Sequence, residues 1–161
     1  MRRWAGLLVV TAMAGVLHAE TLKGRVVGVA DGDTLTVLVD LREVRVRLAE
    51  IDAPEKKQPF GTVAKASLAA MTFGRAVTLD VQDTDRYGRK VARVYAGEQD
   101  VNLEQVSRGM AWAYRKYARD ERIMEAESDA REAGRGLWMA PGAVPPWEWR
   151  KGRRSPRPPS E

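Results

Sequence analysis

Residues that could act on a phosphate ester lie in two short stretches of this sequence. The first stretch reads Asp31-Gly32-Asp33-Thr34, and the second begins at Arg47 and ends with Asp52-Ala53-Pro54-Glu55. Carboxylate oxygens are suitable ligands for hard divalent cations, and the guanidinium of arginine matches the geometry of a phosphate. If the fold brings the two stretches together, they could hold a cation and attack a phosphodiester bound beside it.

The composition limits the kind of metal site that the chain can form. The 161 residues include no cysteine and a single histidine, His18. Disulfides, thiolate chemistry and cysteine-ligated zinc are therefore excluded, and one histidine cannot build a histidine metal site. Any metal must be bound by oxygen, which favours calcium, magnesium or manganese.

The charge of the chain favours anionic partners. The formal net charge is +5 and the sequence pI is about 9.7. A basic balance of this size suits nucleic acid or an acidic membrane surface and does not choose between them. Arg2 and Arg3 contribute to the balance and would leave with a targeting segment, so the position of the remaining basic residues matters more than their number.

Residues 1–19 have the pattern of a secretory signal peptide. Arg2 and Arg3 form a positive start, Trp4 to Leu17 an apolar run, and Leu17-His18-Ala19 a cleavage site before Glu20. The alternative is an uncleaved membrane anchor, but the apolar run is shorter than the ~20 residues needed to span a bilayer. We expect a secreted or periplasmic protein with no stable membrane association after cleavage, and His18 would be discarded.

Apolar periodicity between residues 24 and 138 predicts a single α+β domain, residues 20–138. Alternating apolar positions predict five strands, and Asp31-Gly32 between the first two predicts a hairpin turn. Helical spacing predicts three helices near residues 62–73, 102–108 and 120–133. Periodicity alone supports an α+β meander. A five-stranded OB-like β-barrel with three packed helices is the leading candidate, because an OB-fold consists of five strands with an inserted helix.

The composition changes after Trp138. Residues 139–161 form a Pro/Trp/Arg-rich C-terminal extension. We expect its end to be disordered and its basic residues, Arg150 among them, to be solvated and weakly attractive to nucleic acid. Trp147 and Trp149 are expected to be packing residues rather than base-stacking ones.

Three motifs together resemble one known family. They are Asp31-Gly32-Asp33-Thr34, the Arg47 to Glu55 stretch and Asp85-Arg86-Tyr87-Gly88-Arg89. In this order and at these separations they resemble the thermonuclease family, the staphylococcal-nuclease-like enzymes, over residues 24–138. The resemblance implies an OB-fold barrel with three helices, calcium dependence, and endonucleolytic cleavage of DNA and RNA that leaves 3′-phosphate ends.

The resemblance also implies a role for particular residues. The implied calcium ligands are Asp33, Asp52 and the main-chain carbonyl of Ala53. The implied catalytic trio is Arg47, Glu55 and Arg89. Calcium would act as Lewis acid and template, Glu55 would accept the proton of the attacking water, and the two arginines would stabilise the charge of the phosphate. Arg86 would keep a positive charge beside the substrate.

Aromatic residues extend the predicted substrate site. Tyr87, Tyr114 and Tyr117 could stack on bases or hydrogen-bond a terminal phosphate. An aromatic face accepts any base, which suits a nuclease of low sequence specificity. We expect DNA and RNA as substrates and a monomeric protein, with the preference between the two nucleic acids left open.

Each motif also has a structural interpretation. Asp31-Gly32 alone is typical of a turn, Arg47 on the outer face of a strand could pair with a neighbour, and residues 85–89 could be only a charged hairpin. Two rival functions follow, a non-catalytic OB-fold nucleic-acid binder and a secreted interaction module. The enzyme is favoured over the non-catalytic binder because all of the implied site residues are present, namely Asp33, Asp52, Glu55, Arg47 and Arg89.

Overall fold

The computed structural model describes residues 20–154 of the chain. The predicted signal peptide, residues 1–19, and the end of the extension, residues 155–161, lie outside this range. Between residues 20 and 154, no helix combines the length and the apolar character needed to cross a membrane.

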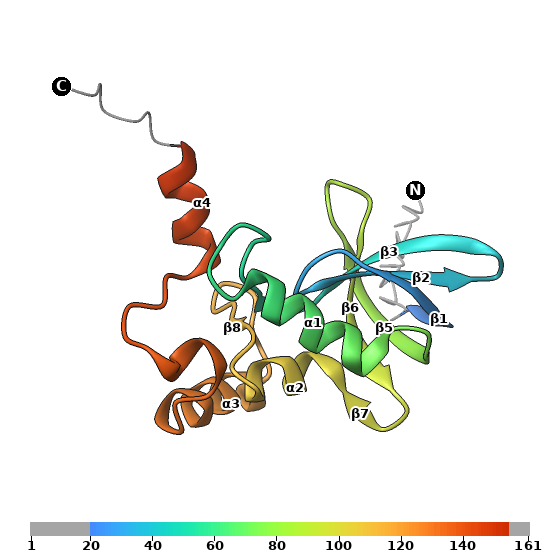
Figure 1. Cartoon of the computed structure of the whole chain (residues 1–161). Helices are drawn as coiled ribbons and strands as arrows, with labels where there is room; N and C mark the ends of the chain where they lie inside the picture. The colour runs from blue at the N-terminus through green and yellow to red at the C-terminus, as the bar shows by residue number, and fades with distance from the viewer. Residues whose placement is uncertain (1–19, 155–161) are drawn as a thin grey trace, which may run out of the picture.

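A closed β-barrel forms the centre of the molecule (Figure 1). Its strands are β1 (Glu20–Val29), β2 (Thr34–Val39), β3 (Arg42–Leu48), β5 (Ala76–Thr84) and β6 (Lys90–Ala96). They follow the order β3-β2-β1-β5-β6, and the short β7 (Gln99–Asp100) pairs antiparallel with the end of β6. β3 also pairs with β6 in parallel, which closes the barrel. The predicted α+β class and five-stranded barrel are confirmed.

The alternation of residue types explains why these segments form the barrel wall. In β3, Val46 and Leu48 are buried while Arg45 and Glu43 face outward, as the period of two along a strand requires. β1 begins before residue 24, where the apolar periodicity starts, because residues 20–25 pair with β5 from Glu20↔Val81 to Arg25↔Ala76. The interior of the barrel and the helices share one apolar core, which includes Leu35, Val37, Leu68, Leu79, Val94 and Ile123.

The three predicted helices are present. They are α1 (Gly61–Thr72), α2 (Val101–Ser107) and α3 (Glu121–Glu132). The side chains of Asp100 and Asp120 accept hydrogen bonds from Leu103 N and Arg122 N, and so cap α2 and α3 at their N-termini. A short 3₁₀ helix, η1 (Gly136–Met139), follows α3.

The hairpin predicted at Asp31-Gly32 is present, but its turn differs from the expected one. Residues with positive φ lie in the next turn, at Asp40 and Leu41, and Gly32 is not among them. A Cβ atom on Gly32 would lie 2.7 Å from the Cβ atoms of both Ala53 and Ala64. Glycine is therefore needed at this position for close packing, which lets the turn lie against α1 and the segment after β4 (Ile51–Asp52).

The extension contains a helix that periodicity did not predict. α4 (Pro146–Arg154) begins where two prolines precede Trp147. Proline suits the first position of a helix, because its missing N–H would have no partner there. Figure 1 shows α4 projecting from the barrel at the end of a long connection after η1.

Candidate active site

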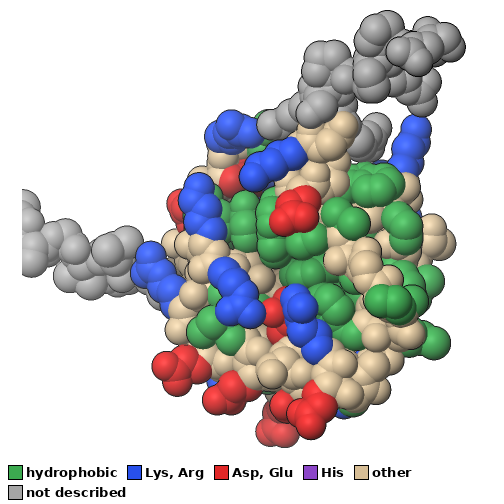
Figure 2. Space-filling view, turned by 90° about the vertical axis from the view of Figure 1, so that its left-hand side faces the viewer, with side chains coloured by type: hydrophobic (Ala, Val, Ile, Leu, Met, Phe, Trp, Pro, Cys, Tyr) green, Lys and Arg blue, Asp and Glu red, His purple; other side chains and the backbone are tan. Residues whose placement is uncertain are grey.

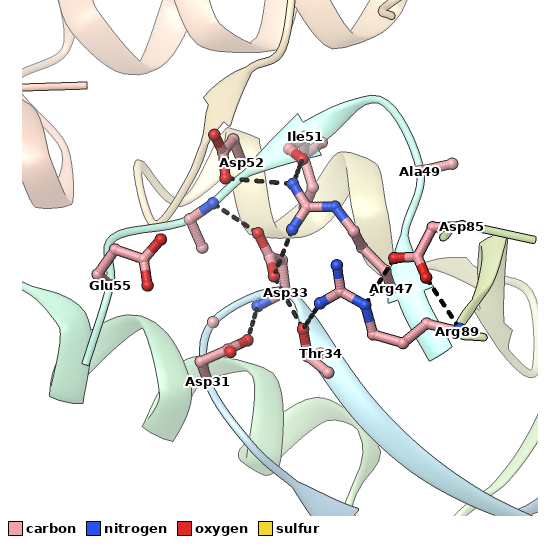
Figure 3. Close-up of polar contacts among 12 residues, drawn as sticks. Asp31, Asp33, Thr34, Arg47, Ala49, Ile51, Asp52, Glu55, Asp85 and Arg89 are labelled. Atoms are coloured by element: carbon pink, nitrogen blue, oxygen red, sulfur yellow. Dashed lines mark hydrogen bonds and ion pairs between the residues drawn. The ribbon is translucent and has the colours of Figure 1, made fainter. Parts of the chain in front are cut away.

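Arg47 lies at the centre of the site and links the two acidic stretches (Figure 3). Its Nη1 lies 3.4 Å from Asp33 Oδ1 and its Nη2 lies 3.2 Å from Asp52 Oδ1. Nη2 also donates to the carbonyl oxygen of Ile51. Burial alone would lower the pKa of Arg47, but the two carboxylates raise it above its ordinary value. The guanidinium therefore remains charged at any working pH.

Asp33 is held in a fixed orientation at the start of β2. Its Oδ2 accepts a hydrogen bond of 2.9 Å from Ala53 N, and its Oδ1 accepts one of 3.1 Å from the Thr34 hydroxyl. The residue is only 4% exposed. Burial, supported by the nearby Asp31, raises the pKa of Asp33 although Arg47 acts in the opposite direction. A carboxylate in such surroundings gains from a cation beside it.

The position of the turn before Asp33 is set by α2. Gln105 is fully buried, and its Nε2 donates to the carbonyl oxygens of Gly32 (2.8 Å) and Ala64 (2.9 Å). This side chain ties the turn to both α1 and α2. The sequence analysis did not identify it, because a glutamine on the buried face of a helix carries no motif.

Asp52 comes from β4, which pairs with β8 (Trp112–Ala113) through Asp52↔Trp112. It is 1% exposed. The following loop carries Glu55, whose side chain is 38% exposed and therefore accessible to water. The Glu55 main-chain N–H donates to Gln58 Oε1 over 3.1 Å, which fixes the start of this loop.

Arg89 enters the site from the hairpin between β5 and β6. Asp85 holds it: Oδ2 accepts from Arg89 Nε over 2.7 Å, and Oδ1 accepts from the main-chain N–H groups of Tyr87 and Arg89. Burial alone would raise the pKa of Asp85, but these hydrogen bonds lower it. Arg89 Nη1 reaches the Thr34 hydroxyl at 3.5 Å. Thr34 thus connects Arg89 to Asp33 Oδ1, the same oxygen that Arg47 contacts.

The predicted nucleic-acid-binding residues lie around the same hollow. Arg86 and Tyr87 form the exposed tip of the β5–β6 hairpin, with the Arg86 guanidinium 4.8 Å from the Tyr87 ring centre. Tyr114 and Tyr117 lie in the segment after β8 and meet edge to face at 4.9 Å. All four of these residues border one open hollow of about 1220 Å³, together with Asp33, Arg47, Asp52, Glu55 and Arg89.

Two residues of the extension also enter the site, and one of them, Arg150, corrects the expectation that the basic residues of the extension are solvated. Arg150 Nη2 lies 2.7 Å from Asp52 Oδ2, and its Nη1 lies 2.8 Å from Glu55 Oε1. Trp147 stacks on Tyr114 with ring centres 5.5 Å apart and an angle of 7° between the planes. The one signal in the sequence is their spacing of three residues, which places both on one face of a helix.

The donor set suits a hard cation. The nearby acidic groups offer oxygen ligands alone, and Asp33 and Asp52 both contact the single guanidinium of Arg47. Among residues 20–154, no group of three acidic or histidine side chains is arranged as a metal cage. A cation bound to Asp33 and Asp52 would therefore complete its shell with main-chain carbonyls, water and substrate. The hydrogen bond from Ala53 N to Asp33 places this residue beside the carboxylate, and its carbonyl as a ligand stays a prediction.

Comparisons with known proteins find one matching family and several similar proteins. The sequence profile of a family described as "Staphylococcal nuclease homologue" matches residues 45–140. Over 162 aligned positions the chain is 46% identical to "Protein ParB" of Escherichia coli, covering 94% of this chain and 91% of the relative. Over 144 positions it is 43% identical to a "Micrococcal nuclease" of Shigella flexneri, covering 83% of each chain. It is 41% identical over 146 positions to an "Uncharacterized endonuclease" of Haemophilus influenzae, covering 90% of this chain and 82% of the relative.

Proposed function

The chain belongs to the family of staphylococcal nuclease homologues, and on this premise we propose that it is a secreted, calcium-dependent endonuclease. It hydrolyses phosphodiester bonds of DNA and RNA with low sequence specificity and leaves 3′-phosphate ends. It acts as a monomer, in the periplasm or outside the cell.

One observation supports this proposal above all others. Two arginines reach the same carboxylate oxygen, Asp33 Oδ1: Arg47 contacts it directly at 3.4 Å, and Arg89 reaches it through the Thr34 hydroxyl at 3.5 Å. Both arginines and the buried carboxylates border one hollow that is open to solvent. A phosphodiester is an anion that gains negative charge during attack, and preorganised positive groups beside it stabilise that charge.

The residues divide the chemistry among themselves. Asp33 and Asp52 would hold the calcium ion, with the Ala53 carbonyl as a further ligand. A bound calcium ion would supply Lewis-acid polarisation of the phosphate and a template for water. Arg47 and Arg89 bind phosphate oxygens and stabilise charge, since a guanidinium does not release its proton at working pH. Glu55, the most exposed of these carboxylates, accepts the proton of the attacking water.

The surroundings of the site account for low specificity. Arg86 at the hairpin tip adds positive charge for the phosphate backbone, a contact that carries no sequence information. Tyr87, Tyr114 and Tyr117 offer aromatic faces on which any base can stack.

A plasmid-degradation assay tests the proposal. We expect loss of supercoiled DNA with calcium chloride and none after addition of a chelator, together with digestion of single-stranded RNA. End-group analysis of a labelled oligonucleotide should give 3′-phosphates. A gel shift without cleavage would instead support the non-catalytic nucleic-acid binder, and neither cleavage nor a shift would support an interaction module.

A further inference from the structure

α4 contacts the site through two side chains that lie one helical turn apart, Trp147 and Arg150. Within residues 20–154, α4 does not pack extensively against any other helix or strand. Figure 2 views the molecule from the side where α4 lies, and hydrophobic side chains gather there between scattered Lys and Arg side chains. The contacts of α4 with the site come from the side chains of Trp147 and Arg150.

The first contact uses the oxygens that a cation would use. Arg150 donates to Asp52 through both terminal nitrogens, at 2.7 and 3.3 Å, and to Glu55 at 2.8 Å. The contacts of 2.7 and 2.8 Å are short, charge-assisted hydrogen bonds. Burial alone would lower the pKa of Arg150, but the carboxylates raise it, so the group stays positive. A divalent cation on Asp52 would be repelled by this guanidinium at close range.

The second contact covers a surface that a base would use. The Trp147 ring lies parallel to the Tyr114 ring, 5.5 Å from centre to centre. A nucleobase can stack on this face of Tyr114 after Trp147 has moved away. Because Trp147 and Arg150 belong to the same helix, release of one contact favours release of the other.

Other contacts of the extension lie away from the carboxylates and the tyrosine. Gln58 Nε2 donates to the Val144 carbonyl over 2.6 Å, and Trp149 borders an apolar hollow of about 170 Å³ with Phe60 and Leu137. Neither contact involves Asp52, Glu55 or Tyr114, so a ligand bound to those residues competes with Arg150 and Trp147.

We propose that α4 is an internal competitor of the ligands: Arg150 takes the place of the cation's charge on Asp52 and Glu55, and Trp147 takes the place of a base on Tyr114. Calcium and nucleic acid displace the helix when they bind. This inference rests on the proposed function of the site and adds a regulatory element to it, because the closed arrangement keeps the site inactive where calcium or nucleic acid is scarce.

Calcium binding measured by isothermal titration calorimetry tests the competition. Arg150→Gln should bind calcium chloride about 5- to 100-fold more tightly than the wild type, within the range usual for coupled sites. The control Arg108→Gln removes the same charge from an exposed pair with Glu104 on α2 and should bind like the wild type. Trp147→Ala should also tighten calcium binding, although Trp147 touches no carboxylate, since it weakens the docking of the whole helix. Equal or weaker binding by both α4 variants would overturn the proposal.

A distance measurement follows the helix directly and does not depend on activity. The sequence has no cysteine, so two introduced cysteines are the only sites that a nitroxide reagent labels. We choose the exposed positions Glu148→Cys in α4 and Lys65→Cys in α1. Without ligands, we expect one narrow distance distribution, which Arg150→Gln should broaden. Calcium chloride with single-stranded oligothymidylate should shift and broaden it in the wild type. An unchanged distribution under both conditions would refute the competitor.

Cleavage assays on the same labelled samples separate this inference from the proposed function. Displacement of α4 without cleavage would refute the nuclease proposal but support the proposal that α4 competes with the ligands. Cleavage with α4 still docked would refute the proposal that α4 competes with the ligands but support the nuclease proposal.

Discussion

Asp85 accepts hydrogen bonds from both the main-chain N–H and the Nε of Arg89, the latter over 2.7 Å. One carboxylate therefore forms the hairpin turn and orients the arginine that reaches toward Thr34. The two interpretations of the 85–89 segment, a charged turn and a part of the active site, are compatible because the same side chain serves both.

Removal of this carboxylate should slow cleavage without unfolding the protein. In Asp85→Ala, Arg89 loses its restraint, and we expect kcat to fall by roughly 10- to 100-fold. In Arg89→Ala, kcat should fall by about 10²–10³-fold. The kcat of Asp85→Asn should lie between those of the wild type and Asp85→Ala, because its amide oxygen still accepts the main-chain hydrogen bonds. Steady-state cleavage of a fluorogenic oligonucleotide measures the rates. Asp83→Ala, in an exposed part of the same hairpin, is the control, and an equal loss in this variant would argue against specific positioning.

Glu55→Gln should abolish most turnover while the fold is retained. Glutamine keeps the shape of the side chain but cannot accept a proton from water, and general-base catalysis typically contributes about 10²–10⁴-fold. Because the Glu55 side chain is 38% exposed, the melting temperature should change little. Glu98→Gln, in the exposed turn between β6 and β7, is the matched control. Cleavage at the wild-type rate would show that Glu55 is not the base.

Gly32→Ala should destabilise the protein and disturb the site together. The new Cβ would lie 2.7 Å from the Cβ atoms of Ala53 and Ala64, and overpacking of this kind costs about 1–3 kcal/mol. Urea unfolding measures the loss. Gly28→Ala is the control, since its Cβ would meet Thr36 at an ordinary 3.5 Å. A similar free energy of unfolding for Gly32→Ala and the wild type would contradict the packing argument.

The stability of the protein should decrease in acid through Asp120. Hydrogen bonds from Arg122, with Arg93 also nearby, lower the pKa of Asp120 to about 2. A carboxylate whose pKa is lower in the folded state stabilises the fold above its unfolded pKa near 4, and this contribution disappears as the pH falls from about 4 to 2. Asp120→Asn keeps a capping side chain on α3 but removes the charge. It should be less stable than the wild type by about 1 kcal/mol at pH 7, a modest value because the pair with Arg122 is near solvent.

Chemical denaturation across pH measures this difference. The two unfolding free energies should converge as the pH approaches 2. A difference that is the same at pH 7 and pH 2 would assign the effect to packing instead of charge.

The mature protein should begin at Glu20. We expect the full-length sequence, expressed in a Gram-negative host, to be recovered from the periplasm or the medium without residues 1–19. Intact mass and N-terminal sequencing identify the first residue. A membrane-bound product that retains Met1 would support the anchor alternative.

The strands, the three central helices and the three motifs could be predicted because they depend on local signals. Alternation of Val44, Val46 and Leu48 indicates a strand, and the resemblance of the three motifs to the thermonuclease family indicates which acidic and arginine residues belong together. The supporting residues could not be predicted in this way. Gln105 has no sequence signal for its contact with Gly32, and Glu50, which could have paired with the arginines of β3, instead binds Arg93 at 2.8 Å. These contacts depend on the positions of helices and strands that are far apart in the sequence.

The sequence by itself determined an α+β meander, because periodicity reports which faces of the strands and helices are buried. The catalytic candidates followed from the resemblance of its three motifs to the thermonuclease family. The tertiary structure decided what approaches that site. Arg150 and Asp52 are 98 positions apart, and no local pattern states where the connection after α3 places α4. Ion pairs and ring stacking act over a few ångströms, so the contacts of Arg150 and Trp147 follow from the path of the folded chain.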